Sequence, residues 1–206
     1  MTSADVTVGA DGVARCWWCG DDPLYVAYHD LEWGVPLRDE RALFELLCLE
    51  GFQSGLSWLT ILRKRDAFRA AFEGFDPAVV AGFEEPDVER LLGDAGIVRH
   101  RGKITATIGN ARALGAMREA GTSLVQEVWS HAPLPRPAAL ARRADIPAQT
   151  PESVTVAKGL KRWGMRFVGP TTVYAFMQSA GLVDDHLDGC HRYGAGASQR
   201  RRTSRA

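Results

Sequence analysis

The sequence predicts an all-α fold, a compact bundle of short helices. Almost every regular apolar pattern repeats at the spacing of a helix, and no convincing pair of alternating strands is present in the sequence. With 206 residues, of which 46% are hydrophobic, the chain can bury a core as one domain or as two small lobes that share an interface. We expect the folded domain to span 13–193, because the compositions of 1–12 and of the basic tail 194–206 favour disorder.

The first long helical pattern begins after Asp39, whose side chain can accept hydrogen bonds from the unpaired amides of a first turn. Its apolar positions are Leu43, Leu46, Leu47 and Phe52. A second pattern follows Gly55, with Leu56, Leu59, Ile61 and Leu62 at helical spacing. The sequence therefore predicts two helices joined near the segment EGFQSG.

Other helix starts are expected where a short polar side chain precedes an apolar pattern, at Asp76, Asp87, Thr122 and Ser153. Between 131 and 151 the chain is rich in proline and alanine. This composition predicts a loop or a connection between lobes.

The sequence shows no feature of a membrane or secreted protein. No apolar run approaches the roughly 20 residues that span a bilayer, and the first residues lack a secretory signal. We therefore expect a cytoplasmic protein that binds no membrane, and a monomer, because no long apolar stripe is left over. In that compartment the four cysteines are expected to be reduced thiols or metal ligands, and Cys48, in an apolar helical run, a buried small side chain.

Charge is unevenly distributed along a chain whose net charge is zero. Residues 1–96 hold 18 acidic and 8 basic side chains, whereas 97–206 hold 7 acidic and 17 basic ones. This asymmetry permits a basic face for phosphate groups, although ordinary solvated helices with a basic tail would give the same counts. Within the basic half, one candidate for such a face is a helix entry with Arg99, Arg101, Lys103 and Arg112.

Four side chains form a candidate metal site. Cys16 and His29 lie early in the chain, and His186 and Cys190, four residues apart, fall on one face of a helical turn. Two thiolates and two imidazoles make a closed tetrahedral set suited to a structural Zn²⁺ ion that would join the N- and C-terminal segments. Spacing cannot pair distant ligands, so the alternative that Cys16 acts with Cys19 as a CxxC redox or zinc motif stays open.

The segment RWGMRFVGPTTVYAFMQSAG has a helix-hairpin-helix layout. A helix is expected to end near Trp163, and Gly164 and Gly169 lie in a tight connection before Pro170 opens the next helix. Glycine lets a phosphate approach the backbone, and the amides of a helix start can bind it. An ordinary corner between two helices would look the same, but basic residues surround this one: Lys158, Lys161, Arg162 and Arg166.

Glu50 lies at the end of the first long helix, in the segment LEGFQSGLSW. The negative end of the helix dipole disfavours a carboxylate there, which suggests a function. The alternative is a glutamate that simply emerges into solvent at a helix end.

From about Arg15 to about Tyr193 the sequence closely resembles the 3-methyladenine DNA glycosylase I family of the helix-hairpin-helix superfamily. The motifs DPLYVAYHDLEWGVP, CLEGFQSGLSW, DAGIVRHRGKI and RFVGPTTVYAFMQSAGLVDDH occur in the order and spacing of that family. The resemblance implies that Cys16, His29, His186 and Cys190 bind structural Zn²⁺. It also implies that Glu50 recognises the base and that the aromatic pocket consists of Tyr25, Tyr28, Trp33 and Trp58.

By the same resemblance, Gly169 and its neighbours Arg166 and Lys161 grip the DNA backbone. Asp184 and Asp185 are given no catalytic role, because the matching region of the family leads into the zinc ligand His186. Trp17 and Trp18 are expected to serve in packing.

The resemblance implies base-excision repair of double-stranded DNA that carries alkylated adenine. The expected enzyme is a monofunctional glycosylase that flips out 3-methyladenine, hydrolyses its N-glycosidic bond and leaves an abasic site. Two alternatives from other classes remain, a zinc-stabilised DNA-binding module without catalysis and a thiol redox protein that uses Cys16 and Cys19.

Overall fold

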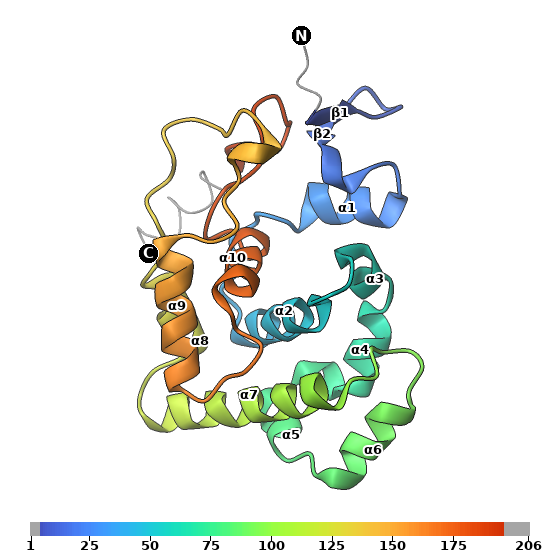
Figure 1. The fold of residues 1–206 in the computed structure, drawn as a ribbon, viewed down its shortest axis with the longest axis vertical. Coiled ribbons are helices and arrows are strands. Elements are labelled where there is room, and N and C mark those ends of the chain that lie inside the picture. Colours follow the sequence, from blue (N-terminus) through green and yellow to red (C-terminus); the bar gives the residue numbers. More distant parts are fainter. Residues whose placement is uncertain (1–4, 196–206) are drawn as a thin grey trace. The chain divides into compact units, whose positions relative to one another are not determined.

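The computed structural model of the chain describes residues 5–195 (Figure 1). Those residues are mostly helical, which confirms the all-α prediction. The α-helices are α1 (Pro23–Leu31), α2 (Glu40–Gln53), α3 (Trp58–Arg63), α4 (Arg65–Ala71), α5 (Pro77–Ala81), α6 (Glu85–Gly93), α7 (Arg101–Glu119), α8 (Leu124–Trp129), α9 (Pro151–Arg162) and α10 (Pro170–Ser179). Three short 3₁₀ helices are η1 (Trp17–Cys19), η2 (Glu73–Phe75) and η3 (Arg143–Asp145).

The described residues divide into two compact units. Unit 1 contains 5–37, 132–148 and 177–195, and unit 2 contains 38–131 and 149–176. The expected loop between 131 and 151 is confirmed, since it contains only η3 and an isolated β-bridge between Leu140 and Leu187. The basic tail lies almost entirely outside the described residues. No helix within 5–195 is long and apolar enough to cross a membrane.

Unit 1 begins with a β-hairpin that the sequence did not predict. Strands β1 (Val6–Val8) and β2 (Ala14–Cys16) pair antiparallel, with Val6 opposite Cys16. The expectation of disorder through residue 12 is therefore wrong for β1. Strands of three residues are too short to show an alternating pattern, and Gly12, with φ of 74°, supplies the left-handed backbone of the turn.

The hairpin brings the N- and C-terminal parts of unit 1 together. Val6, Cys16, Leu187 and Cys190 form one buried apolar cluster. Beside it, the backbone amide of His191 donates to the carbonyl of Ala14 at 3.0 Å. The end of β2 is therefore fixed against the chain around 190.

Unit 2 is built around α2 and α7, and α7 contacts α2, α5 and α6 (Figure 1). Its core is rich in phenylalanine, and Phe52 packs on Phe68 with ring centroids 4.6 Å apart. Phe52 is fully buried there. Asp39 and Asp76 cap α2 and α5 as predicted.

Three other helix starts were displaced by one to three residues. α8 is capped by Ser123, next to the predicted Thr122. Asp87 and Ser153 lie at the third helical position, where each side chain accepts from the amide of the true N-cap residue. Such reciprocal capping uses similar side chains at both positions, so the sequence does not distinguish them.

Candidate functional site

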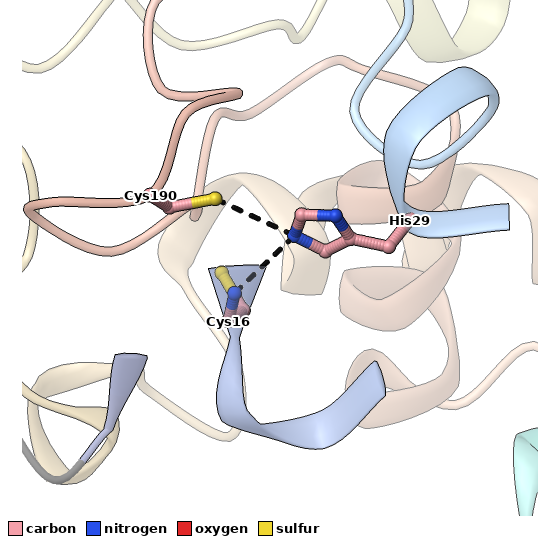
Figure 2. Close-up of side chains that lie close together, drawn as sticks. All are labelled: Cys16, His29 and Cys190. Atoms are coloured by element: carbon pink, nitrogen blue, oxygen red, sulfur yellow. Dashed lines mark hydrogen bonds between the residues drawn. The ribbon is translucent and has the colours of Figure 1, made fainter. Parts of the chain in front are cut away.

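Cys16, His29 and Cys190 converge in the interior of unit 1 (Figure 2). Cys16 ends β2, His29 lies in the last turn of α1, and Cys190 follows the buried Leu187. Their potential ligand atoms all lie within 4.8 Å of one another, and His29 Nε2 is 3.4 Å from Cys190 Sγ. Three of the four predicted metal ligands thus come together from distant parts of the chain.

A carboxylate orients the His29 ring. His29 Nδ1 lies 2.8 Å from Asp30 Oδ1, which leaves Nε2 directed at the cysteines. Asp30 in turn accepts from Arg15 Nη2 at 2.7 Å, and Arg15 also binds Asp11 at 2.8 Å. Carboxylate–histidine pairs of this kind fix the ring and its tautomer at metal sites.

His186, the fourth predicted ligand, lies beside the cluster in a similar setting. Its ring centroid is 5.2 Å from that of His29, and its Nδ1 is 2.9 Å from Asp184 Oδ1. Its buried Nε2 has no hydrogen-bond partner among the residues the structure describes. A buried nitrogen without a partner is costly, and metal coordination would satisfy it.

The neighbouring acidic pair is used inside unit 1. Asp184 contacts His186, and Asp185 accepts from Gln178 Nε2 at 2.8 Å and from Arg136. These contacts give both carboxylates partners within unit 1.

The pKa values of the two cluster thiols are shifted in opposite directions. Cys16 hydrogen-bonds to the Cys190 sulfur, which lowers the pKa of Cys190 far below that of an ordinary thiol, and His29 adds to the effect. The same contact, together with burial, raises the pKa of Cys16. Cysteine sulfur and histidine nitrogen are the donor atoms that Zn²⁺ prefers.

Cys19 does not belong to this cluster of ligand atoms. Its thiol donates to the backbone carbonyl of Cys16 at 3.2 Å. Burial raises its pKa to about 11, whereas redox-active thiols have lowered pKa values and partial exposure. The geometry therefore disfavours the CxxC redox alternative.

Three of the four predicted pocket aromatics lie in unit 1, around a residue that the sequence assigned to packing. The ring centroid of Trp18 lies 5.0 Å from the centroids of Tyr25 and Trp33, and 6.3 Å from that of Tyr28. Trp33 also lies edge-on to His186 at 4.5 Å, next to the metal cluster. Trp18 is thus part of the aromatic group. The signal in the sequence that could have indicated this is its position, two residues after the predicted metal ligand Cys16.

Glu50 lies in unit 2, in the last turn of α2, and is only 4% exposed. The alternative that it emerges into solvent is therefore wrong. Trp58, the remaining predicted pocket aromatic, is the buried first residue of α3. A short loop joins the two helices, in which the Leu56 amide donates to the Gln53 carbonyl at 2.6 Å and Ser57 caps α3.

Two helices lie on either side of the predicted hairpin segment, since α9 ends at Arg162 and α10 begins at Pro170. Asn110 on α7 fixes its backbone by accepting from the Arg166 amide at 2.9 Å and donating to the Arg166 carbonyl at 3.2 Å. The side chains of Lys161 and Arg166 are exposed. A Cβ atom at Gly169 would meet no described atom within 4 Å, so packing does not require glycine there.

Most basic side chains of the other candidate segment, 99–112, contact residues of the protein itself. Arg101 pairs with Glu85 and Glu89 on α6. Lys103 is buried, and Arg112 donates to the carbonyls of Ala81 and Phe83, both at 2.9 Å. These three side chains make contacts within unit 2, and Arg99 is exposed.

A family model described as methyladenine glycosylase matches residues 18–193. The chain belongs to the methyladenine glycosylase family. Members of this family are DNA repair enzymes that hydrolyse N-glycosyl bonds, so the protein is a DNA glycosylase. The match begins after β2, so the hairpin that supplies Cys16 lies outside it.

Among curated proteins, this methyladenine glycosylase is 53% identical to DNA-3-methyladenine glycosylase 1 of Escherichia coli over 180 residues, 87% of this chain and 96% of the relative. It is 44% identical to DNA-3-methyladenine glycosylase of Haemophilus influenzae, over 85% of this chain and 96% of the relative. Both relatives are matched over nearly their whole length.

Solved structures of 3-methyladenine DNA glycosylases also match this chain. A crystal structure of 3-methyladenine DNA glycosylase I matches with a TM-score of 0.84 and 53% identity, over 87% of this chain and 99% of that one. A structure of the Staphylococcus aureus enzyme that addresses 3-methyladenine recognition matches with a TM-score of 0.82 and 38% identity, over 87% of this chain and 96% of that one. The methyladenine glycosylase fold therefore includes both units.

Proposed function

We propose that this glycosylase excises 3-methyladenine from double-stranded DNA, acts as a monomer and leaves an abasic site. The observation that carries the proposal is a buried carboxylate, Glu50, in a chain matched along most of its length by enzymes named for that base. A DNA substrate would place the enzyme with the chromosome, and the proposed location is the cytoplasm.

The proposed mechanism begins with the substrate. Methylation at N3 makes adenine a cationic purine with a weakened glycosidic bond, so less catalytic assistance is needed than for a normal base. The base is flipped out of the duplex, and aromatic faces hold the cation by attraction worth about 0.5 to 2 kcal/mol. We assign this role to Tyr25, Tyr28, Trp33 and Trp58.

Glu50 would recognise the same base through its charge. A carboxylate accepts hydrogen bonds from the exocyclic amine of adenine, and charge-assisted bonds of this kind are about twice as strong as neutral ones. Neutral adenine gains neither the ionic attraction nor the cation–π term. Lys161, Arg166 and Gly169 would position the duplex by contacts to its phosphates, which carry no sequence information.

Zn²⁺ is proposed as a structural ion bound by Cys16, His29, His186 and Cys190. The fit rests on the buried cluster of thiols and imidazole and on the buried Nε2 of His186. Bound there, the ion would tie β2, α1 and the chain around 190 into one unit.

Release of free bases tests the proposed reaction. Wild-type protein incubated with methylated duplex DNA is expected to release 3-methyladenine and neither 7-methylguanine nor adenine, as measured by chromatography. Equal release of 7-methylguanine would contradict the proposed selectivity. Binding to DNA without release of any base would favour the non-catalytic DNA-binding module instead.

The enzyme is expected to be monofunctional. Strand cleavage by a glycosylase uses an amine that forms a Schiff base with the sugar. Of the four lysines in the chain, Lys64 and Lys103 donate to backbone carbonyls, and Lys158 and Lys161 lie on the exposed side of α9. Borohydride should therefore trap no covalent adduct during base release, and strands should break only on alkaline treatment. A trapped adduct that forms at the rate of base release would disprove this.

A further inference from the structure

Lys103 is a buried cation whose contacts lie at the end of the helix that carries Glu50. The residue is 7% exposed, and its Nζ donates to the carbonyls of Phe52 at 2.8 Å and Ser54 at 2.7 Å. Burial lowers its pKa, so the site imposes a cost on the ammonium form. Two short charge-assisted hydrogen bonds to backbone offset part of that cost.

The two carbonyls belong to the turn that ends α2. Phe52 lies in the last turn of the helix and Ser54 is its C-cap residue. Both groups are among the carbonyls that a helix end leaves without intrahelical partners. A cation at this end also offsets the negative pole of the helix dipole, which opposes the buried carboxylate of Glu50 in the same turn.

The same turn begins the loop that leads to Trp58. From the C-cap residue Ser54 the chain passes through Gly55, whose φ of 84° is left-handed, to Ser57, which caps α3. Lys103 reaches this loop from the first turn of α7, a 19-residue helix that packs against α2, α5 and α6. The amine therefore connects a long, well-packed helix to the short segment between two proposed base-binding residues.

Lys103 itself is held firmly. His100 caps α7 by accepting from the Lys103 amide at 3.2 Å, and Thr107 Oγ1 donates to the Lys103 carbonyl at 3.1 Å. Its side chain lines a small pocket with Gly51, Phe52 and Asn110. The backbone of Lys103 is thus fixed in the first turn of α7, and its side chain is buried.

We propose that Lys103 is a positioning residue, which holds the end of α2 and the following loop so that Glu50 and Trp58 keep the geometry needed for base excision. The proposal rests on the function proposed above for those two residues. Lys103 acts through the backbone of Phe52 and Ser54 and touches neither substrate nor reacting atoms. Loss of its amine should therefore impair the chemical step more than DNA binding.

A pair of variants tests this proposal. Lys103→Met removes the amine and keeps an unbranched apolar side chain. Arg112→Met is the matched control, because Arg112 also lies on α7 and also donates to the carbonyls at a helix end, that of α5. Three quantities are measured for each variant: kcat for 3-methyladenine release, Kd for undamaged duplex DNA, and hydrogen exchange of peptides that cover 50–58.

For Lys103→Met we expect kcat to fall about 10- to 100-fold, since misplacement of a reacting geometry by about 1 Å has effects of that size. Kd should change less than about threefold, and exchange should increase in 50–58. Arg112→Met should leave kcat and exchange in 50–58 unchanged. If Lys103→Met does not fold, Lys103→Gln, which retains a neutral donor, should show the same pattern with a smaller decrease in kcat.

Three results would overturn the proposal: unchanged exchange in 50–58, an unchanged kcat despite faster exchange, or equal losses of kcat in both variants. Hydrogen exchange is measured without substrate, so it tests the hold on the loop even if the wild type releases no base. In that event the proposed function fails, and the exchange result alone still tells whether Lys103 fixes the loop.

Discussion

Glu50→Gln is expected to lower the rate of 3-methyladenine release at least about 100-fold, because the amide removes the charge that favours a cationic base and its transition state. The same change should not destabilise the fold. Glu50 is buried at the negative end of α2, where a carboxylate costs free energy and a neutral amide of the same shape costs less. Activity and stability should therefore respond in opposite directions.

The measurement combines single-turnover base release with thermal unfolding. Glu45→Gln supplies the control, because Glu45 lies on the same helix and pairs with Arg69 at 2.8 Å. That variant should retain the wild-type rate and lose up to about 1 kcal/mol of stability, as is usual for a pair near the surface. If Glu50→Gln retains more than a third of the wild-type rate, the carboxylate does not have the proposed role.

The helices of this protein could be predicted from sequence because their signals are local. Apolar spacing after Asp39 and the proline at 170 predicted α2 and the start of α10 at the observed residues. The hairpin of β1 and β2 could not be predicted in this way. Its strands are too short for a pattern, and its stability comes from contacts with the chain near 190, which are distant in sequence.

Side-chain roles that depend on tertiary contacts were the hardest to predict. The sequence gives Lys103 and Arg112 as two positive charges in a basic segment, yet both donate to carbonyls inside unit 2. The count of basic residues in 97–206 therefore overstates the basic surface available to DNA. Residue types alone likewise could not show whether Cys16 acts with Cys190 or with Cys19. In the structure Cys16 lies in a buried cluster with Cys190, and the thiol of Cys19 bonds to a backbone carbonyl instead.

This pairing leads to the second large effect, on stability. Purified protein is expected to contain about one zinc ion per chain, and Cys16→Ser should lose it. An ion present at about 1,000 times its Kd stabilises the folded state by about 4 kcal/mol, so the variant should unfold at a clearly lower temperature. A strong chelator should lower the unfolding temperature of the wild type towards that of the variant, since both remove the same ion.

Cys19→Ser is the matched control for Cys16→Ser. Cys19 is as deeply buried as Cys16 and lies three residues away, but its thiol hydrogen-bonds to the backbone of Cys16 and not to the other ligands. A serine hydroxyl can make the same bond, so this variant should keep its zinc and most of its stability. If Cys19→Ser loses its zinc and Cys16→Ser keeps it, the ligand is Cys19 and the proposed assignment to Cys16 is wrong. A metal-free wild type with unchanged stability in both variants would mean that the cluster is held by packing and hydrogen bonds alone.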